Sequence, residues 1–269
     1  MPVADGHPLK ADHALLLEAV SEAGELAKSL FDRGVETWNK SDNTPVTEAD
    51  LAVDTLLNET LSRARPDYGW LSEETQEDPI RRDFKRVWIV DPIDGTKGFV
   101  RGTDQWCIAA ALVEDGVPLL GVVVNPVRGE IFEAAQGEGA YCNGKRLAAS
   151  APQDVSGCHL IMHDSLLQSK KWDKPWPHLK LSMQTSMAMR LCRVAQGEAD
   201  GTVVISGKSD WDLAAADLLV HEAGGKVTSL TGDPMRYNGP ETRHHGIVGA
   251  GNAFHDQLLA HTCGWKRNT

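Results

Sequence analysis

The sequence feature that most constrains this chain is the stretch Val87–Thr96, which reads V-W-I-V-D-P-I-D-G-T. Its four leading residues are apolar and mostly β-branched, so they predict a short buried strand that ends at Asp91. Pro92 fixes φ and has no N–H, and it therefore predicts the end of the hydrogen-bonded ladder. Asp91 and Asp94 stand three residues apart across this turn. Their oxygens can converge on one hard cation such as Mg²⁺.

Gly95 and Thr96 follow the second aspartate at a point where a helix can begin. The first N–H groups of a helix have no partner within it, so they can bind a phosphate. Taken by itself, the stretch is equally consistent with a solvated turn that caps a helix, because D-x-x-D-G sequences are common in turns. Other parts of the sequence are needed to distinguish a site that binds a metal ion and phosphate from a solvated turn.

The composition is that of a globular protein with one large domain or two of ordinary size. The chain has 269 residues, of which 41% are hydrophobic and 24% are charged. No apolar run approaches the roughly 20 residues of a membrane helix, and Met1–Lys10 has no signal-peptide core. We therefore expect a cytoplasmic protein with no membrane partner.

The charge balance bears on the partners of the protein. A formal net charge of −11, from 27 basic and 38 acidic residues, argues against nucleic acid as the main partner. The same charge would repel a phosphorylated substrate unless cations intervene. The five cysteines are odd in number and form no C-x-x-C pair. Free thiols are therefore expected instead of a disulfide framework or a zinc site.

Hydrophobic spacing predicts two helices and then a sheet in the first part of the chain. Asp12 can cap a first helix that runs until Gly34. Thr47 and Asp50 have the spacing of a capping box, which would open a second helix. Strands are expected at 68–71, 106–113, 117–124 and 130–135, the last three as hairpins of one antiparallel sheet.

The later part of the chain alternates between strands and helices, which is typical of helices layered on a sheet. Strands are expected at 159–162, 202–205, 226–230 and 246–249, and helices at 186–196, 211–223 and 252–261. The segment 149–157 separates the two patterns. It is the expected boundary between halves formed by residues 1–150 and 151–269.

Acidic residues recur where these predicted elements begin or end. They are Asp50, Glu73, Asp91, Asp94 and Asp212. Each has an ordinary explanation alone, because an acidic residue in the first turn of a helix complements the helix dipole and surface acids are common. Together they could supply the carboxylates for two or more Mg²⁺ ions at the spacing of about 3.5–4 Å that two-metal phosphate chemistry requires.

Several motifs occur together in order. They are TEAD at 47–50, SEE at 72–74, DPIDGT at 91–96, GEGA at 137–140 with NG at 143–144, and WDLAAA at 211–216 followed by EAGG at 222–225. In sequence and spacing they resemble the inositol monophosphatase family, the Mg²⁺-dependent and Li⁺-sensitive phosphatases. The resemblance covers about residues 14–251, so the acids are interpreted as ligands and not as solvated turns.

The resemblance implies a mixed α/β (α+β) fold, a layered α-β-α-β-α sandwich of the inositol monophosphatase and fructose-1,6-bisphosphatase type. Residues 1–150 would form a half with an antiparallel sheet and most metal ligands. Residues 151–269 would supply Asp212 and the substrate pocket. The resemblance also implies two or three Mg²⁺ ions per site, a small phosphorylated metabolite as the partner, and a homodimer.

The resemblance further implies which residues hold the ions. Glu73, Asp91 and the carbonyl of Ile93 would hold the first metal. Asp91, Asp94 and Asp212 would hold the second. A third ion would rest on Glu73.

The remaining roles implied by the resemblance concern catalysis and phosphate binding. Asp50 would orient Thr96, and Thr96 together with Glu73 would position the attacking water. The N–H groups of Gly95 and Thr96 would hold the phosphate, as the first N–H groups of a helix can.

Substrate choice depends on other positions. Inositol-specific members of the family carry a glutamate where this chain has Ile205, and isoleucine cannot accept hydrogen bonds from substrate hydroxyls. Arg190 stands where the 3′(2′),5′-bisphosphate nucleotidases tend to carry a lysine, so it could meet a second phosphate. An arginine on a helix is more often a surface residue. Thr185 and Ser186 belong to the same predicted substrate pocket.

The resemblance to the branches of the family is divided. The stretch Lys40–Thr47 and the charged loop after Glu74 look like the nucleotidase branch, whereas Gly137–Leu147 looks like the inositol branch. We favour adenosine 3′,5′-bisphosphate as the substrate, with inositol 1-phosphate and then histidinol phosphate as alternatives. A regulatory or binding protein on the same fold is the non-enzyme alternative.

Overall fold

The computed structural model describes residues 8–39, 45–169, 171–262 and 265. Of the stretch that resembles the nucleotidase branch, residues 40–44 lie outside the described residues, as does Cys263. Cys107, Cys142, Cys158 and Cys192 are free, as predicted. None of the described helices combines the length and apolar character needed to cross a membrane.

The larger sheet has seven strands in the order β3-β4-β5-β6-β7-β8-β9. The strands are β3 (Gly69–Ser72), β4 (Arg86–Asp94), β5 (Cys107–Glu114), β6 (Val117–Asn125), β7 (Glu130–Ala135), β8 (Gly139–Cys142) and β9 (Lys145–Arg146). β3 is parallel to β4, and the other neighbours are antiparallel. The predicted hairpins are therefore confirmed.

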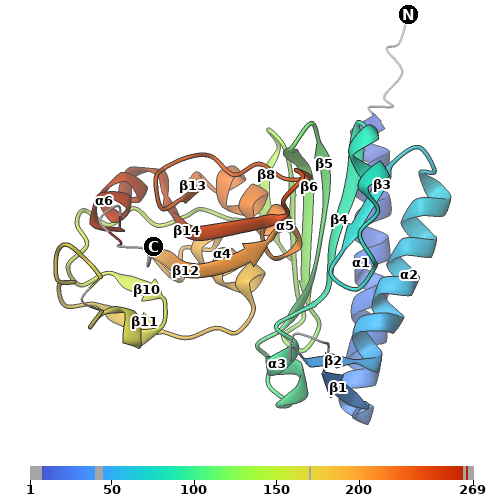
Figure 1. Ribbon diagram of the computed structural model, residues 1–269, viewed down its shortest axis with the longest axis horizontal. Coiled ribbons are helices and arrows are strands. Elements are labelled where there is room, and N and C mark those ends of the chain that lie inside the picture. The colour runs from blue at the N-terminus through green and yellow to red at the C-terminus, as the bar shows by residue number, and fades with distance from the viewer. Residues whose placement is uncertain (1–7, 40–44, 170, 263–264, 266–269) are drawn as a thin grey trace, which may run out of the picture.

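Two long helices, α1 (Pro8–Arg33) and α2 (Glu48–Ala64), cover one face of this sheet (Figure 1). Between them, the short strands β1 (Thr37–Asn39) and β2 (Pro45–Thr47) pair with each other. The capping box of Thr47 and Asp50 opens α2 as predicted.

The smaller sheet has five strands in the order β11-β10-β12-β14-β13. The strands are β10 (His159–Ile161), β11 (Lys180–Ser182), β12 (Gly201–Ser209), β13 (Gly225–Ser229) and β14 (Arg243–Gly251). Helices α4 (Met187–Ala195) and α5 (Asp210–Glu222) lie between the two sheets, and α6 (Asn252–Thr262) packs on the outer face of the smaller one (Figure 1). The predicted layered α-β-α-β-α sandwich is confirmed. The short helices are η1 (Pro79–Asp83), α3 (Thr96–Val100) and η2 (Asp164–Leu166).

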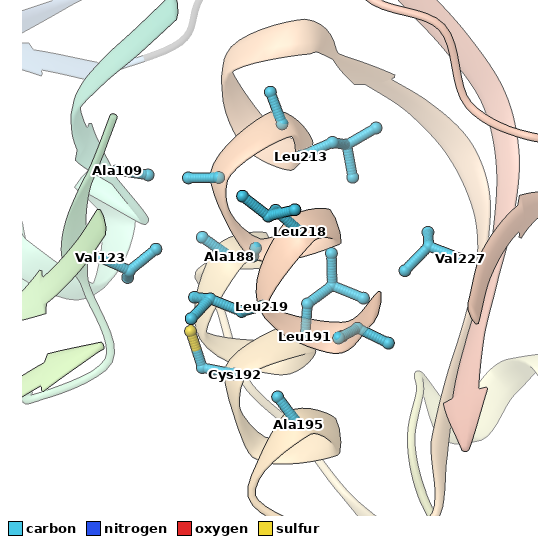
Figure 2. Packing of buried hydrophobic residues seen from close by; sticks show 14 of the residues in the cluster. Ala109, Val123, Ala188, Leu191, Cys192, Ala195, Leu213, Leu218, Leu219 and Val227 are labelled. Atoms are coloured by element: carbon cyan, nitrogen blue, oxygen red, sulfur yellow. The ribbon is translucent and has the colours of Figure 1, made fainter. Parts of the chain in front are cut away.

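The core between the sheets joins residues from both parts of the chain. Figure 2 shows Ala109 and Val123 of the larger sheet facing α4 and α5, with Val227 of the smaller sheet on the opposite side. α5 can approach the larger sheet closely because β6 carries Gly121. A Cβ at Gly121 would lie 2.5 Å from the carbonyl oxygen of Ala215. A shared core of this kind holds α5, whose first turn carries Asp212, at a fixed distance from β4. The division at residue 150 stays a prediction.

The predicted role of Asp12 is wrong. α1 begins at Pro8, so Asp12 lies inside the helix and is 1% exposed. Its carboxylate accepts hydrogen bonds from Arg65 Nε at 2.6 Å, Tyr68 OH at 2.8 Å and Arg86 Nη1 at 3.1 Å. Asp12 therefore ties α1 to the end of α2 and the start of β4, a long-range contact that a capping pattern cannot reveal.

Candidate active site

The turn that carries Asp91 and Asp94 is a bulge within β4, not the end of the strand. Asp91 pairs with Ala109 of β5 and Asp94 pairs with Cys107, so three residue steps on β4 face two on β5. Pro92 lies in the bulge, where no ladder N–H is needed, and the prediction that it ends the ladder is therefore wrong. Because side chains alternate along a strand, the extra residue allows both aspartates to point to the same side.

Gly95 connects the bulge to α3 and has a φ of +93°. A Cβ at this position would lie 2.7 Å from the Gln105 carbonyl oxygen, so glycine is required both by the backbone conformation and by space. α3 begins at Thr96, as the sequence predicts. The assignment of the Gly95 and Thr96 N–H groups to phosphate binding stays a prediction.

Three carboxylates converge at the meeting point of the two sheets. One oxygen from each of Asp91, Asp94 and Asp212 lies within 4.8 Å of the others. Asp91 and Asp94 come from β4, and Asp212 comes from the first turn of α5, where its Oδ2 accepts a hydrogen bond from Ser209 N at 2.6 Å. The fold thus brings together residues that lie more than a hundred positions apart in sequence.

The electrostatics of this cluster favour a bound cation. Burial raises the pKa of Asp91 well above its usual range, and the charges of Glu73, Asp94 and Asp212 raise it further. Burial also raises the pKa of Asp94, and repulsion from the charge of Asp212 is the second-largest cause of the rise. A divalent cation would relieve this repulsion, and carboxylate oxygens are the donors that Mg²⁺ prefers. The residues present therefore fit Mg²⁺.

Asp94 is held in place by the start of α4. Its Oδ2 accepts hydrogen bonds from Ser186 Oγ and Ala188 N, both at 2.6 Å, and its Oδ1 accepts one from Met187 N at 3.1 Å. Thr185 Oγ1 donates to the Gln105 carbonyl at 2.5 Å. The hydroxyls of Thr185 and Ser186 thus bond to groups of the protein, and their predicted contact with substrate stays a prediction.

Asp50 and Thr96 meet beside the bulge. Thr96 Oγ1 lies 3.3 Å from Asp50 Oδ1 and 3.1 Å from the Ile93 carbonyl oxygen. The other oxygen of Asp50 accepts from Thr47 N at 2.8 Å and from Thr47 Oγ1 at 2.6 Å. Burial raises the pKa of Asp50 to about 6, despite these bonds, and the charge of Glu73 adds to the rise.

Glu73 lies close enough to influence both neighbouring acids. Its N–H donates to the Val90 carbonyl at 3.3 Å, which places it beside the strand that leads to Asp91. Its charge raises the pKa of both Asp50 and Asp91. The predicted ligand role of Glu73 is consistent with this position and stays a prediction, as do the roles assigned to Ile93 and Thr96.

The second part of the chain adds two cationic side chains to the site. Lys208 Nζ lies 3.2 Å from Asp212 Oδ1, and the charge of Asp94 also acts on Lys208. Arg190, at the start of α4, lies within the electrostatic reach of Asp94 and Asp212. Sequence reasoning identified Arg190 but missed Lys208. Lys208 could have been found from the sequence, because it stands four residues before Asp212, a spacing that favours an ion pair at the start of a helix.

Ile205 lies on β12, three residues before Lys208. It packs, partly buried, against the hydrophobic cluster of the smaller sheet, which includes Leu160, Val203 and Phe254. The register of β12 against β14 shifts between Val204 and Gly207, so Ile205 lies in an irregular part of the strand. Its predicted place in the substrate pocket stays a prediction.

The chain is similar to known proteins over almost its whole length. The profile of the inositol monophosphatase family matches residues 10–265. Histidinol-phosphatase of Mycobacterium tuberculosis is 36% identical over 265 residues, covering 92% of this chain and 96% of that protein. The 3′(2′),5′-bisphosphate nucleotidase CysQ of Aggregatibacter actinomycetemcomitans is 30% identical over 261 residues, covering 90% and 91%. The solved extragenic suppressor protein suhB from Bartonella henselae has a TM-score of 0.81 at 27% identity, covering 94% of this chain and 98% of that one.

Proposed function

The chain belongs to the inositol monophosphatase family, and from that premise we propose that it is a Mg²⁺-dependent phosphomonoesterase acting on a small phosphorylated metabolite. Its broad class, a phosphatase, follows from the family. Among the possible substrates we favour a 3′(2′),5′-bisphosphate such as adenosine 3′,5′-bisphosphate. The observation that carries the proposal is the convergence of the Asp91, Asp94 and Asp212 carboxylates within 4.8 Å. A phosphate ester is itself anionic, so such a cluster can act on it only with cations bound between them.

The ligand sets are those that the resemblance to the family implies, and the convergence of Asp91, Asp94 and Asp212 supports one of them. Asp91, Asp94 and Asp212 would hold one ion, and Glu73, Asp91 and the Ile93 carbonyl would hold another. When bound, Mg²⁺ neutralises charge on the phosphate and on the leaving oxygen and lowers the pKa of a water molecule. The protein supplies a fixed arrangement of oxygens, because Asp94 is held by Ser186 and the first N–H groups of α4.

We expect Thr96 to orient the attacking water. Its hydroxyl has one proton and two acceptors nearby, Asp50 Oδ1 at 3.3 Å and the Ile93 carbonyl at 3.1 Å. When that proton is donated to either oxygen, the lone pairs of Thr96 Oγ1 can accept a hydrogen bond from water. Asp50 must be ionised to serve as an acceptor at both of its oxygens. Thr47 holds it in the required position through the capping box.

Two other substrates remain candidates. Histidinol phosphate is favoured by the name of the 36% identical relative from Mycobacterium tuberculosis. Inositol 1-phosphate is less favoured because Ile205 cannot accept hydrogen bonds from its hydroxyls. A regulatory or binding protein on the same fold is the non-enzyme alternative, and a cytoplasmic homodimer with Li⁺ sensitivity is the state that the resemblance implies.

A panel of phosphate esters tests the proposal. Release of inorganic phosphate would be measured with adenosine 3′,5′-bisphosphate, myo-inositol 1-phosphate, histidinol phosphate and fructose 1,6-bisphosphate, with Mg²⁺ and with EDTA in its place. We expect Mg²⁺-dependent release and the highest kcat/KM for the nucleotide. No release from any ester by the pure protein would exclude the enzyme, and a higher kcat/KM for inositol 1-phosphate or histidinol phosphate would exclude the favoured substrate.

A further inference from the structure

The second part of the chain contributes two positively charged side chains, Lys208 and Arg190, to an otherwise acidic site. Lys208 Nζ contacts Asp212 Oδ1 at 3.2 Å, and its side chain is 22% exposed. Arg190 is partly buried, and its Nε donates to the Gln184 carbonyl at 2.7 Å, which restrains the guanidinium, while the charges of Asp94 and Asp212 act on it. In a chain with a net charge of −11, two cations at one site are a local exception.

Burial defines the direction from which a ligand reaches the carboxylates. Asp91 and Asp94 are 1% and 4% exposed, and β4, the strand that carries them, is buried from Val87 onward. Asp212, Lys208 and Arg190 are all partly exposed. A ligand that meets the three aspartates from this exposed side therefore comes close to Lys208, whose Nζ lies 3.2 Å from Asp212 Oδ1. The charge that a substrate carries near its reacting phosphate must therefore be compatible with the positive charges of Lys208 and Arg190.

We propose that Lys208 is a specificity-determining residue, which with Arg190 selects phosphate esters that carry a second anionic group close to the phosphate being removed. The proposal rests on the proposed phosphatase function and names the class of substrate for the same site. Lys208 reaches the site from the end of β12, one residue before Ser209 caps α5. Its flexible stem allows the ammonium to follow a ligand, whereas Arg190 is fixed by its bond to Gln184.

Charge separates the candidate substrates. A 3′,5′-bisphosphate carries a second phosphate, which two cations attract through charge-assisted hydrogen bonds. Inositol 1-phosphate has neutral hydroxyls apart from its phosphate. Histidinol phosphate carries an amine that is protonated near neutral pH, and Lys208 and Arg190 would repel it. The positive charges of Lys208 and Arg190 thus argue against histidinol phosphate, the substrate in the name of the relative that is 36% identical.

Lys208 also has a function without substrate, because it neutralises part of the charge of Asp212. A divalent cation held by Asp212 would compete with the ammonium for Oδ1 and weaken this ion pair. Lys208 would then be available for an anion of the substrate. An alternative role, in which Lys208 only reduces the affinity of the site for Mg²⁺, makes a different prediction about selectivity.

Substitutions at Lys208 test the proposal through selectivity. The variants are Lys208→Met, which removes the charge at similar length, and Lys208→Arg, which keeps it. Lys226→Met is the matched control, because Lys226, on β13 of the smaller sheet, also pairs with an aspartate, Asp256 of α6, at 3.5 Å. For each protein, kcat and KM would be measured with adenosine 3′,5′-bisphosphate, adenosine 5′-monophosphate and histidinol phosphate. Calorimetry would give the affinities for Mg²⁺ and for adenosine 5′-monophosphate.

We expect Lys208→Met to lower the ratio of kcat/KM for the bisphosphate over the monophosphate about 10- to 100-fold, chiefly through KM. The ratio of histidinol phosphate to bisphosphate should rise, and Lys208→Arg should restore most of the original selectivity. Tighter Mg²⁺ binding with unchanged selectivity would overturn the proposal, as would an equal loss in Lys226→Met. If the wild-type protein hydrolyses none of these esters, the proposed phosphatase function itself fails, which is a separate outcome from unchanged selectivity.

Discussion

The two walls of the site differ in burial and in charge. The wall formed by β4 and the first turn of α2 contains Asp50, Asp91 and Asp94, which are all at most 4% exposed and are all acidic. The wall formed by β12 and the start of α5 contains Asp212 and Lys208, which are partly exposed and opposite in charge. We interpret the acids of the first wall, together with Asp212 of the second, as the part that serves phosphate hydrolysis, and Lys208 of the second wall as the part that selects the ester.

The largest effect is expected from the buried wall. Asp91→Asn should lower kcat by at least about 10³-fold, because the central carboxylate of the proposed ligand sets loses its charge. In metal-free protein the same change should raise thermal stability, since it removes a buried charge that Glu73, Asp94 and Asp212 repel. Asp32→Asn is the control, because Asp32 forms an exposed pair with Lys28 on α1. Wild-type turnover in Asp91→Asn would refute the proposed role of Asp91 as a metal ligand.

A smaller loss is expected at the residue that orients water. Thr96→Ala should lower kcat about 10²-fold with little change in KM, because the hydroxyl beside Asp50 and the Ile93 carbonyl is removed. Thr96→Ser keeps the hydroxyl and should retain most of the activity. Steady-state kinetics on the preferred ester would measure both. An equal loss in the serine variant would indicate a packing role for the threonine methyl group.

The pH dependence of stability probes the same wall without substrate. Burial raises the pKa of Asp50 from 3.8 to about 6, so between these values the folded protein binds more protons than the unfolded chain. The free energy of unfolding of metal-free protein should therefore fall as pH rises from about 4 to about 6, by roughly 3 kcal/mol from this residue. Urea unfolding in EDTA would measure it.

Two variants separate the contribution of Asp50 from that of other acids. Asp50→Asn should reduce the slope of stability against pH, whereas Asp67→Asn, on an exposed turn, should not. An unchanged slope in Asp50→Asn would contradict the assignment. Added Mg²⁺ should reverse the trend, because the acids must lose their protons to bind it.

The distance between the walls depends on how closely α5 packs on β6. Gly121→Ala would place a Cβ 2.5 Å from the Ala215 carbonyl oxygen, so α5 would have to shift. We expect a loss of about 1–3 kcal/mol in unfolding free energy and weaker Mg²⁺ binding, because Asp212 moves with α5. Gly239→Ala is the control, since its nearest neighbour to a new Cβ is at 3.4 Å. Equal stability of the two variants would show that the walls are not held by this contact.

Much of the fold could be predicted from local sequence patterns. The capping box of Thr47 and Asp50 and the hairpins around β5 to β7 are formed by neighbours in sequence, and they were confirmed. Asp12 and Pro92 were misjudged for related reasons. Asp12 is stabilised by arginines from other elements, and Pro92 is tolerated because a bulge in β4 needs no N–H there.

The sequence by itself determined the family and the acids that are expected to bind metal, because residues that bind a metal and a phosphate must be of particular types at particular spacings. Only the tertiary structure decided how these acids stand toward one another and which other charges join them. Asp91 and Asp212 meet because α5 is packed between two sheets, and Lys208 enters with the strand that leads to that helix. Spacing along the chain can indicate a local ion pair such as Lys208 and Asp212. The electric field that a substrate meets, however, is the sum of charges on several helices and strands, which only packing brings together.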